Sequence, residues 1–222
     1  MYLFLVNSLR LGAGSGFIYL FYFFMQNVLA HNYLLASKFL TLLNIFYLGI
    51  HFLLNVLLSS CNKPRATMTM SNVALTISLF VMVAFWTIHS KDPKLLVDGD
   101  KRLPDWLNHA THTAPFAACF LETILHHPAK PYFFTGLTLL LTLSGVYVGI
   151  LEFSITKENF YPYPFLKMLD NDSRYKFFGA CVGGMAVSFM IIYFFLIFIR
   201  SDHAGVAKSK KAEKKKKQKK QD

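Results

Sequence analysis

The sequence has few charged side chains and few cysteines for its length. Only 16% of its 222 residues are Asp, Glu, Lys or Arg, whereas soluble domains carry about 25%, so a water-soluble domain of this size would lack the polar surface to cover its core. The three cysteines, Cys61, Cys119 and Cys181, are far apart, which excludes a CxxC pair and a disulfide framework. A cleaved signal peptide is not favoured, because no basic segment precedes the first apolar run.

Apolar residues are abundant and fall into long blocks. They make up 54% of the chain and form six blocks that approach the roughly 20 residues needed to cross a bilayer as a helix. Lipid offers no partner to backbone N–H and C=O groups, so each block is predicted to be helical. We therefore predict an all-α fold, a polytopic membrane helical bundle of about six transmembrane helices within residues 1–200. The predicted spans are Leu11–Ala30, Phe39–Ser60, Val73–His89, Asp105–His126, Phe133–Leu151 and Phe177–Ile199.

Much of the net charge of +11 lies at the C-terminus, where residues 201–222 contain nine lysines and three acidic residues. Blocks of like charge stay solvated, so we predict a disordered, lysine-rich cytosolic tail that contacts anionic lipid headgroups and not nucleic acid. Lys219 and Lys220 are placed as in dilysine retrieval signals, which are addresses read by receptors. This favours an endomembrane, chiefly the endoplasmic reticulum, with the plasma membrane as a further location.

An even number of spans places both termini on one side of the membrane. With the termini in the cytosol, that side carries 14 Lys and Arg residues, among them Arg10 and the nine tail lysines, and the other side carries nine. Without the tail the count reverses to five against nine. The positive-inside rule therefore favours opposite orientations with and without the tail. We predict cytosolic termini because a nine-lysine tail is hard to translocate. The sequon at Asn171 then faces the lumen, close to the last span.

Polar side chains follow one face of the second span. Thr41, Asn44, His51 and Asn55 are separated by three, seven and four residues, which is helical spacing. Hydrogen bonding between neighbouring helices is the simpler interpretation of the two asparagines. Ionisable groups inside a span are costly and are a functional hypothesis by default.

The fourth span opens with a second polar cluster, in which Asn108 and His112 share a face and His109 lies beside them. Glu122 follows ten residues after His112, displaced by about a quarter-turn. Even-numbered spans start on the same side of the membrane, so Thr41 and His112 are expected at similar depth. The connector that contains Tyr163 closes over that side.

Such a pair suits acyl transfer, because a neutral imidazole can take the proton of a hydroxyl and make it nucleophilic. Asn44, Asn108 or a backbone N–H would then stabilise the oxyanion. A single threonine near a helix start is, however, commonly bonded to nearby backbone.

A metal site and a transporter are the two alternatives to this acyl-transfer site. His51, His109, His112, Glu122 and the His126-His127 pair are permissible metal ligands, but His126 lies roughly 21 Å from His112 along a helix. We therefore predict no metal and no other cofactor. A transporter is disfavoured because the sequence has no internal repeat and no matching pair of broken helices.

Four segments then carry a family resemblance, which runs from about Lys38 to the sixth span. They are Lys38-Phe39-Leu40-Thr41, Phe85-Trp86 followed by Asp92, Trp106-Leu107-Asn108-His109-x-x-His112-Thr113, and Tyr163-Pro164-Phe165-Leu166 ahead of Phe177-Phe178-Gly179. In order and spacing the chain resembles the family of the androgen-induced gene 1 protein and the androgen-dependent TFPI-regulating protein.

The resemblance implies an intramembrane threonine hydrolase that takes its lipid substrate from the bilayer. Members of that family cleave fatty acid esters of hydroxy fatty acids (FAHFA) into a fatty acid and a hydroxy fatty acid. Thr41 would be the nucleophile and His112 the base, with Asn108, His109 and Glu122 in supporting roles. The segment after Asp92, Pro93-Lys94-Leu95-Leu96-Val97, departs from the family pattern, so the acyl-chain preference of the family is not carried over to this chain. The alternative is a non-catalytic membrane protein that regulates or scaffolds partners.

Overall fold

The computed structural model describes the backbone of residues 2–96, 103–125 and 129–218, and within these ranges the side chains of residues 3–198. It contains helices and turns, with no strand in the described ranges. Five single helices are long and apolar enough to cross a membrane. They are α1 (Tyr2–Asn27), α3 (Leu40–Ser60), α4 (Pro64–His89), α7 (Phe133–Glu158) and α8 (Asn171–Gln218).

The remaining predicted span is built from three consecutive segments, α5 (Asp105–Asn108), a π-turn η2 (His109–Thr113) and α6 (Ala114–Leu125). Residues 105–125 rise by roughly 30 Å, which matches the hydrocarbon thickness of a bilayer. Pro115 lies two residues after the π-turn and has no N–H to donate to the preceding turn, which favours the irregular hydrogen bonding there. The predicted fold class, a helical membrane bundle, is confirmed. The predicted end at His126 lies outside the described residues.

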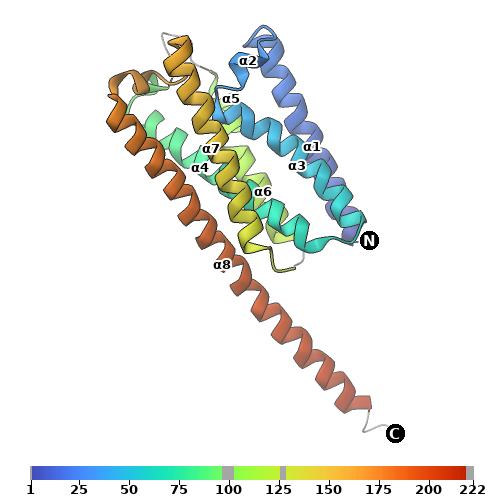
Figure 1. Ribbon diagram of the computed structural model, residues 1–222. Helices are drawn as coiled ribbons and strands as arrows, with labels where there is room; N and C mark the ends of the chain where they lie inside the picture. Colours follow the sequence, from blue (N-terminus) through green and yellow to red (C-terminus); the bar gives the residue numbers. More distant parts are fainter. Residues whose placement is uncertain (1, 97–102, 126–128, 219–222) are drawn as a thin grey trace.

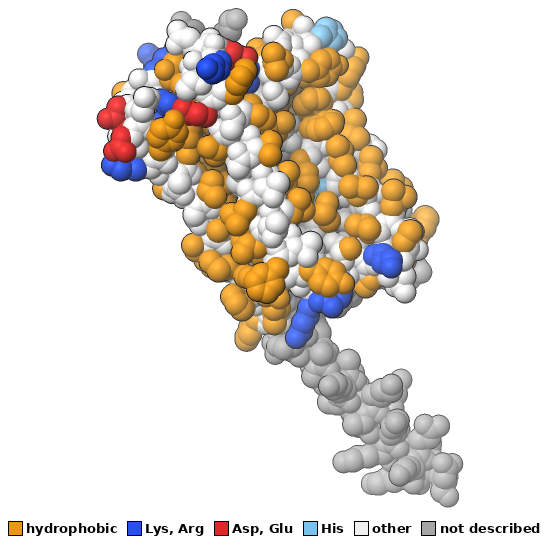
Figure 2. Space-filling model, viewed as in Figure 1, with side chains coloured by type: hydrophobic (Ala, Val, Ile, Leu, Met, Phe, Trp, Pro, Cys, Tyr) orange, Lys and Arg blue, Asp and Glu red, His pale blue; other side chains and the backbone are white. Residues whose placement is uncertain are grey.

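Helix α4 lies at the centre of the bundle and packs against α3, α6, α7 and α8. Helix α1 packs along α3 on one side of it, and α7 and α8 lie together on the other (Figure 1). The space-filling view shows apolar side chains over the middle of the visible face and charged side chains towards its ends (Figure 2). This is the surface expected of a helical bundle surrounded by lipid.

Helices α1 and α3 approach closely at two glycines. A Cβ on Gly49 would lie 2.6 Å from Cγ1 of Ile18, and one on Gly14 would lie 3.2 Å from the carbonyl oxygen of Gly49. Small residues allow such close helix contacts in membranes. The contact brings the first half of α1, including Arg10, against the core.

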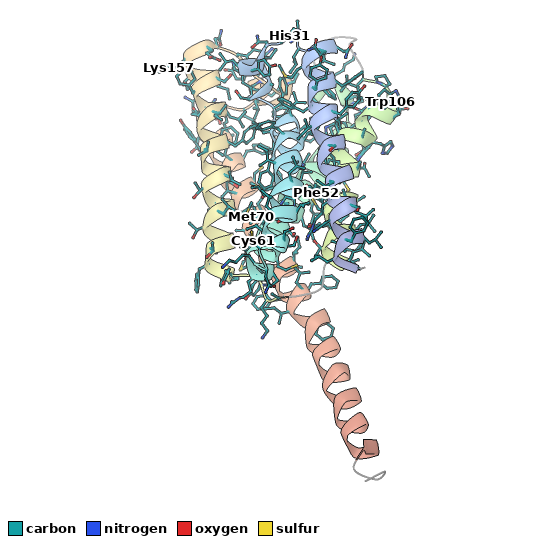
Figure 3. All side chains as sticks on the ribbon, turned by 90° about the vertical axis from the view of Figure 1, so that its right-hand side faces the viewer. His31, Phe52, Cys61, Met70, Trp106 and Lys157 are labelled. Carbon is teal, nitrogen blue, oxygen red and sulfur yellow. The ribbon has the colours of Figure 1, made fainter. Side chains whose placement is uncertain are left out.

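Short elements connect the helices at the end of the bundle that carries the start of α3. They are α2 (Tyr33–Ala36), η1 (Pro93–Leu95) and η3 (Pro164–Met168). Figure 3 shows His31 and Lys157 at this end and Cys61 near the opposite end. Trp106 is 62% exposed and also lies toward the His31 end, as expected for an interfacial tryptophan.

Several helices are longer than predicted. Helix α1 begins at Tyr2 and not at Leu11, and α4 begins at Pro64 and not at Val73. The added turns carry polar side chains that are buried against other helices. A hydropathy scale scores such side chains as the end of a membrane span. Arg10, counted from the sequence among the charges on the cytosolic side, lies within α1 and is 1% exposed inside the bundle. Helix α7 likewise runs on to Glu158, and α8 begins at Asn171.

Helix α8 continues past the bundle to Gln218 (Figure 1). The sequence predicts disorder from Ser201, whereas the backbone drawn there is helical. Ala, Lys, Glu and Gln, which make up most of this segment, are favourable helix formers, which accounts for a helical course without packing partners. The division into a membrane domain and a cytosolic tail stays a prediction, and the dilysine pair lies outside the described residues.

Candidate active site

The start of α3 meets the π-turn of the fourth span. The hydroxyl Oγ1 of Thr41 lies 3.2 Å from Nε2 of His112. Thr41 is in the first turn of α3 and is half-buried, and His112 is 6% exposed. The structure thus brings into contact two side chains that were expected only at similar depth, and their catalytic roles stay a prediction.

The other ring nitrogen of His112 decides which tautomer faces Thr41. Nδ1 lies 2.9 Å from the carbonyl oxygen of Asn108 and 2.9 Å from Oγ1 of Thr111. The hydroxyl of Thr111 donates its own proton to the carbonyl oxygen of Leu107 at 2.8 Å, so both neighbours of Nδ1 act as acceptors. Nδ1 thus carries the proton in the neutral ring, and Nε2 presents a lone pair to the Thr41 hydroxyl.

Aromatic side chains of α4 hold the imidazole in place. The rings of Phe85 and His112 are stacked with centroids 3.4 Å apart and planes at 9°. Trp86, the next residue, donates from Nε1 to Oγ1 of Thr113 at 3.0 Å. The ring of His112 is thereby fixed on one face by Phe85 and at Nδ1 by the main chain, an arrangement that limits its rotation.

Thr41 and His112 lie in the wall of a largely apolar chamber of about 760 Å³. Its lining extends from Phe24 on α1 to Met185 on α8 and includes Tyr163 in the last connector. Pockets of this size hold lipid-sized or drug-sized ligands. The predicted cover by the Tyr163 connector is confirmed.

Two tyrosines meet at the residue before Thr41. The backbone N–H of Leu40 donates to the hydroxyl oxygens of Tyr147 and Tyr163, both at 3.1 Å. The two hydroxyl oxygens are 3.2 Å apart. Tyr163 lies in a connector, and burial raises the pKa of its phenol above the ordinary value, so the hydroxyl stays protonated at neutral pH. Neither tyrosine was assigned a site role from the sequence.

The predicted supporting residues are placed differently from one another. Asn44 exchanges hydrogen bonds with Ser78 on α4 at 3.3 and 3.4 Å and does not line the chamber. Asn108 does line it, but its side-chain amide donates to the carbonyl oxygen of Leu103 at 3.3 Å. His109 is exposed, with Nδ1 3.2 Å from Thr113 Oγ1 and its ring centroid 4.8 Å from that of Trp86. Of these three, only Asn108 contacts His112, and it does so through its carbonyl.

Glu122 belongs to a second buried cluster, away from the chamber. Its carboxylate accepts from Nε of Arg10 and Nδ2 of Asn55, both at 2.9 Å, and from Oγ of Ser71 at 2.8 Å. Nε2 of His51 lies 3.4 Å from it. Arg10 and Glu122 form a buried ion pair. Glu122 therefore supports the helix packing, and its supporting role in catalysis stays a prediction.

No three His, Cys, Asp or Glu side chains gather into a possible metal site within the ranges that the structure describes. His51 lies beside Glu122, but the guanidinium of Arg10 already pairs with that carboxylate. His126 and His127 lie outside those ranges.

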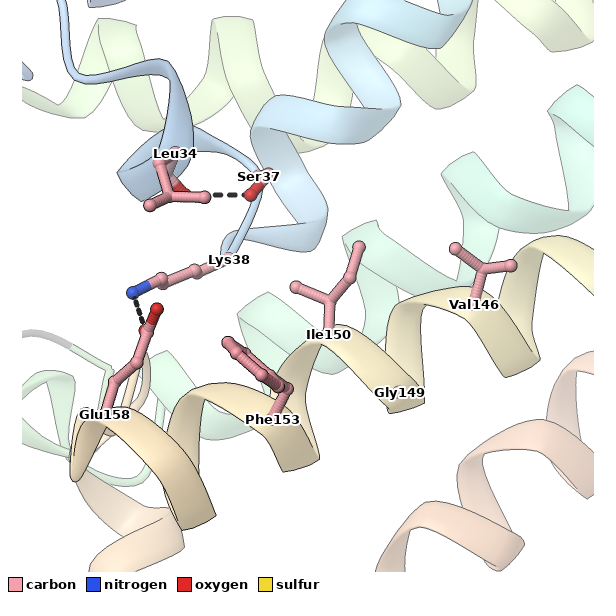
Figure 4. A pocket seen from close by; sticks show the side chains of 8 residues that line it. All are labelled: Leu34, Ser37, Lys38, Val146, Gly149, Ile150, Phe153 and Glu158. Atoms are coloured by element: carbon pink, nitrogen blue, oxygen red, sulfur yellow. Dashed lines mark hydrogen bonds and ion pairs between the residues drawn. The ribbon is translucent and has the colours of Figure 1, made fainter.

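A smaller pocket of about 330 Å³ lies between α2 and α7 (Figure 4). Lys38 and Glu158 form an ion pair at one end of it, and the ammonium of Lys38 lies 4.7 Å from the centre of the Phe160 ring. The walls are apolar side chains and Gly149. The ion pair ties the residues just before Thr41 to the end of α7.

Comparison with known proteins identifies the family of this chain. The family model described as FAR-17a/AIG1-like protein matches residues 7–196. The chain belongs to this family. It is 32% identical over 113 residues to the human androgen-induced gene 1 protein, covering 49% of this chain and 46% of that protein. It is 31% identical over 157 residues to the mouse androgen-dependent TFPI-regulating protein, covering 65% and 68%.

The human androgen-dependent TFPI-regulating protein is 30% identical over 131 residues, with 57% of this chain and 51% of that protein covered. The match thus spans about half the length of both human relatives. No solved structure matches the chain. The comparisons thus establish that the chain is a member of the FAR-17a/AIG1-like family.

Proposed function

We propose that this protein is an intramembrane threonine hydrolase that cleaves fatty acid esters of hydroxy fatty acids into a fatty acid and a hydroxy fatty acid. The observation that carries the proposal is the Thr41–His112 contact of 3.2 Å in the wall of an apolar chamber. A hydroxyl facing the unprotonated nitrogen of a positioned imidazole is the arrangement of an activated nucleophile. Its chemistry needs no metal and no organic cofactor.

The reaction divides into two steps. Oγ1 of Thr41 attacks the ester carbonyl carbon while Nε2 of His112 takes the hydroxyl proton, and the same nitrogen returns that proton to the departing alcohol oxygen. This leaves an acyl-threonine. Nε2 of His112 then takes a proton from a water molecule as it attacks the acyl carbon, and the proton passes to Thr41 as the fatty acid leaves.

The shape of the chamber supports a lipid ester as the substrate. Its lining runs from α1 to α8, and the reactive pair lies within that lining. An ester joining two long chains would place its carbonyl at Thr41 and its two chains in the apolar parts of the chamber. Lateral entry from the bilayer avoids moving these chains through water.

Hydrolysis by the purified, detergent-solubilised protein tests the proposal. We expect wild type to release both products and to be labelled at Thr41 by a fluorophosphonate probe. Thr41→Ala should lower turnover by about 10³-fold or more and abolish labelling, because the nucleophile is absent, whereas Thr41→Ser retains a hydroxyl and should remain labelled. A folded wild type with neither turnover nor labelling would favour the non-catalytic, regulatory alternative.

We further propose that the protein resides in an endomembrane, chiefly the endoplasmic reticulum, and that its lysine-rich end binds anionic headgroups. The nine lysines of residues 201–222 support the contact with anionic headgroups. Replacing Lys219 and Lys220 together by serine should shift a tagged protein from the endoplasmic reticulum towards the cell surface in fluorescence microscopy. An unchanged distribution would contradict the retrieval role.

A further inference from the structure

The attacking hydroxyl and its base leave one requirement of ester cleavage unassigned, the group that stabilises the oxyanion. The electron pair of the carbonyl moves onto oxygen when Thr41 attacks, and donors placed at that oxygen usually make the largest contribution to the rate. The two asparagines expected to serve are engaged elsewhere, Asn44 with Ser78 and Asn108 with the carbonyl oxygen of Leu103.

The backbone N–H of Thr41 itself is a free donor. The first N–H groups of a helix have no intrahelical partner, and in the first turn of α3 those of Leu42 and Leu43 donate to the carbonyl oxygen of Phe39. The N–H of Leu40 is taken by the two tyrosines. Nothing among the described residues accepts from the N–H of Thr41. The positive end of the helix dipole adds to its attraction for an anion.

Tyr163 supplies a second donor on the same side. The hydroxyl of Tyr147 gives its single proton to the carbonyl oxygen of Lys38 at 3.3 Å. The proton of Tyr163 is therefore directed either to the oxygen of Tyr147, 3.2 Å away, or into the chamber that both side chains line. A ligand oxygen with negative charge is a better acceptor than a phenol oxygen that already accepts from Leu40.

The spacing of these two donors fits one oxygen atom. The Tyr163 hydroxyl oxygen is 3.1 Å from the nitrogen of Leu40, and adjacent backbone nitrogens in a helix are roughly 3 Å apart. The Tyr163 oxygen and the Thr41 nitrogen are thus within roughly 6 Å, so an oxyanion between them can accept from both at normal hydrogen-bond lengths.

On the basis of the proposed hydrolase function, we infer that the backbone N–H of Thr41 and the hydroxyl of Tyr163 form the oxyanion hole. Tyr163 is then a catalytic residue that acts on the reacting oxygen, and Tyr147 is a positioning residue that holds the start of α3. The connector between α7 and α8 thereby contributes directly to the chemistry.

Tyr163→Phe tests this inference, with Tyr147→Phe as the matched comparison, because each removes one hydroxyl that accepts from Leu40. We expect Tyr163→Phe to lower kcat by about 10²- to 10³-fold, with KM changed by less than about threefold. Tyr147→Phe should lower kcat by less than about tenfold. A long-chain trifluoromethyl ketone, which adds to Thr41 and forms an oxyanion, should bind Tyr163→Phe more weakly by a factor similar to the loss in kcat.

Retention of kcat within threefold in Tyr163→Phe would overturn the inference, as would equal losses in the two variants, which would indicate a shared positioning role. Unweakened trifluoromethyl ketone binding in Tyr163→Phe would also overturn it. Failure of the proposed function is distinguishable, because it would appear in wild type as absent turnover and an unlabelled Thr41, and it would overturn both.

Discussion

His112→Ala is expected to lower ester turnover by about 10⁴-fold, with little change in folding, because it removes the group that takes the proton of Thr41. The imidazole is fixed by Phe85 and by the carbonyl oxygen of Asn108, and its removal takes away the nitrogen that faces the Thr41 hydroxyl at 3.2 Å. The measurement is the rate of fatty acid release by the purified variant at saturating substrate.

A double variant separates a catalytic pair from two independently useful residues. If Thr41 and His112 act as a unit, Thr41→Ala combined with His112→Ala should be no slower than the slower single variant. His109→Ala is the matched control, since this histidine lies three residues away and contacts Trp86 and Thr113 outside the chamber. It should lose less than about tenfold. If the losses in turnover of the two single variants add in the double variant, Thr41 and His112 do not act as a unit.

Glu122→Leu is expected to destabilise the protein by about 3–5 kcal/mol, because it leaves the charge of Arg10 buried without its partner. Arg10 is 1% exposed and Glu122 6% exposed, and the three polar neighbours of the carboxylate also lose their acceptor. The measurement is the unfolding midpoint in a fixed detergent, followed by tryptophan fluorescence.

Removing both buried charges should recover most of the stability that Glu122→Leu loses. Arg10→Met combined with Glu122→Leu removes both charges and keeps apolar volume, so it should be more stable than either single variant. The control is Asp172→Ala, which breaks the exposed pair with Lys176 and should cost less than about 1 kcal/mol. A double variant as unstable as Glu122→Leu would show that the ion pair is not the main contribution of Glu122.

The sequence predicted the similar depth of Thr41 and His112, because helix count and membrane side are properties of the hydropathy pattern, whereas their roles as nucleophile and base come from the family resemblance and stay a prediction. Thr41 and His112 each lie near the start of an even-numbered span, and this alone places them at similar depth. The tautomer of His112 was beyond prediction, since it depends on the main-chain carbonyl of Asn108. The contact of Tyr163 with Leu40 depends on the path of a connector, which residue patterns do not determine.

The contact of Arg10 with Glu122 was not predicted from the sequence. Hydropathy placed Arg10 before the first span, yet it pairs with Glu122, 112 residues away. A signal for this existed in the sequence, because an acid inside a span requires a cationic or hydrogen-bonding partner. Applying that requirement to Glu122 would have moved the start of α1 towards the N-terminus.

The π-turn at His109–Thr113 sets the angular offset between the two buried clusters. Asn108 and His112 meet the start of α3, whereas Glu122, further along the same segment, meets Arg10. Deleting one residue from the turn would allow a regular α-helix, but it would rotate one half against the other by about 100°. Only one cluster would then keep its partners, so the local irregularity lets a single helical segment hold both the Thr41–His112 contact and the Arg10–Glu122 ion pair.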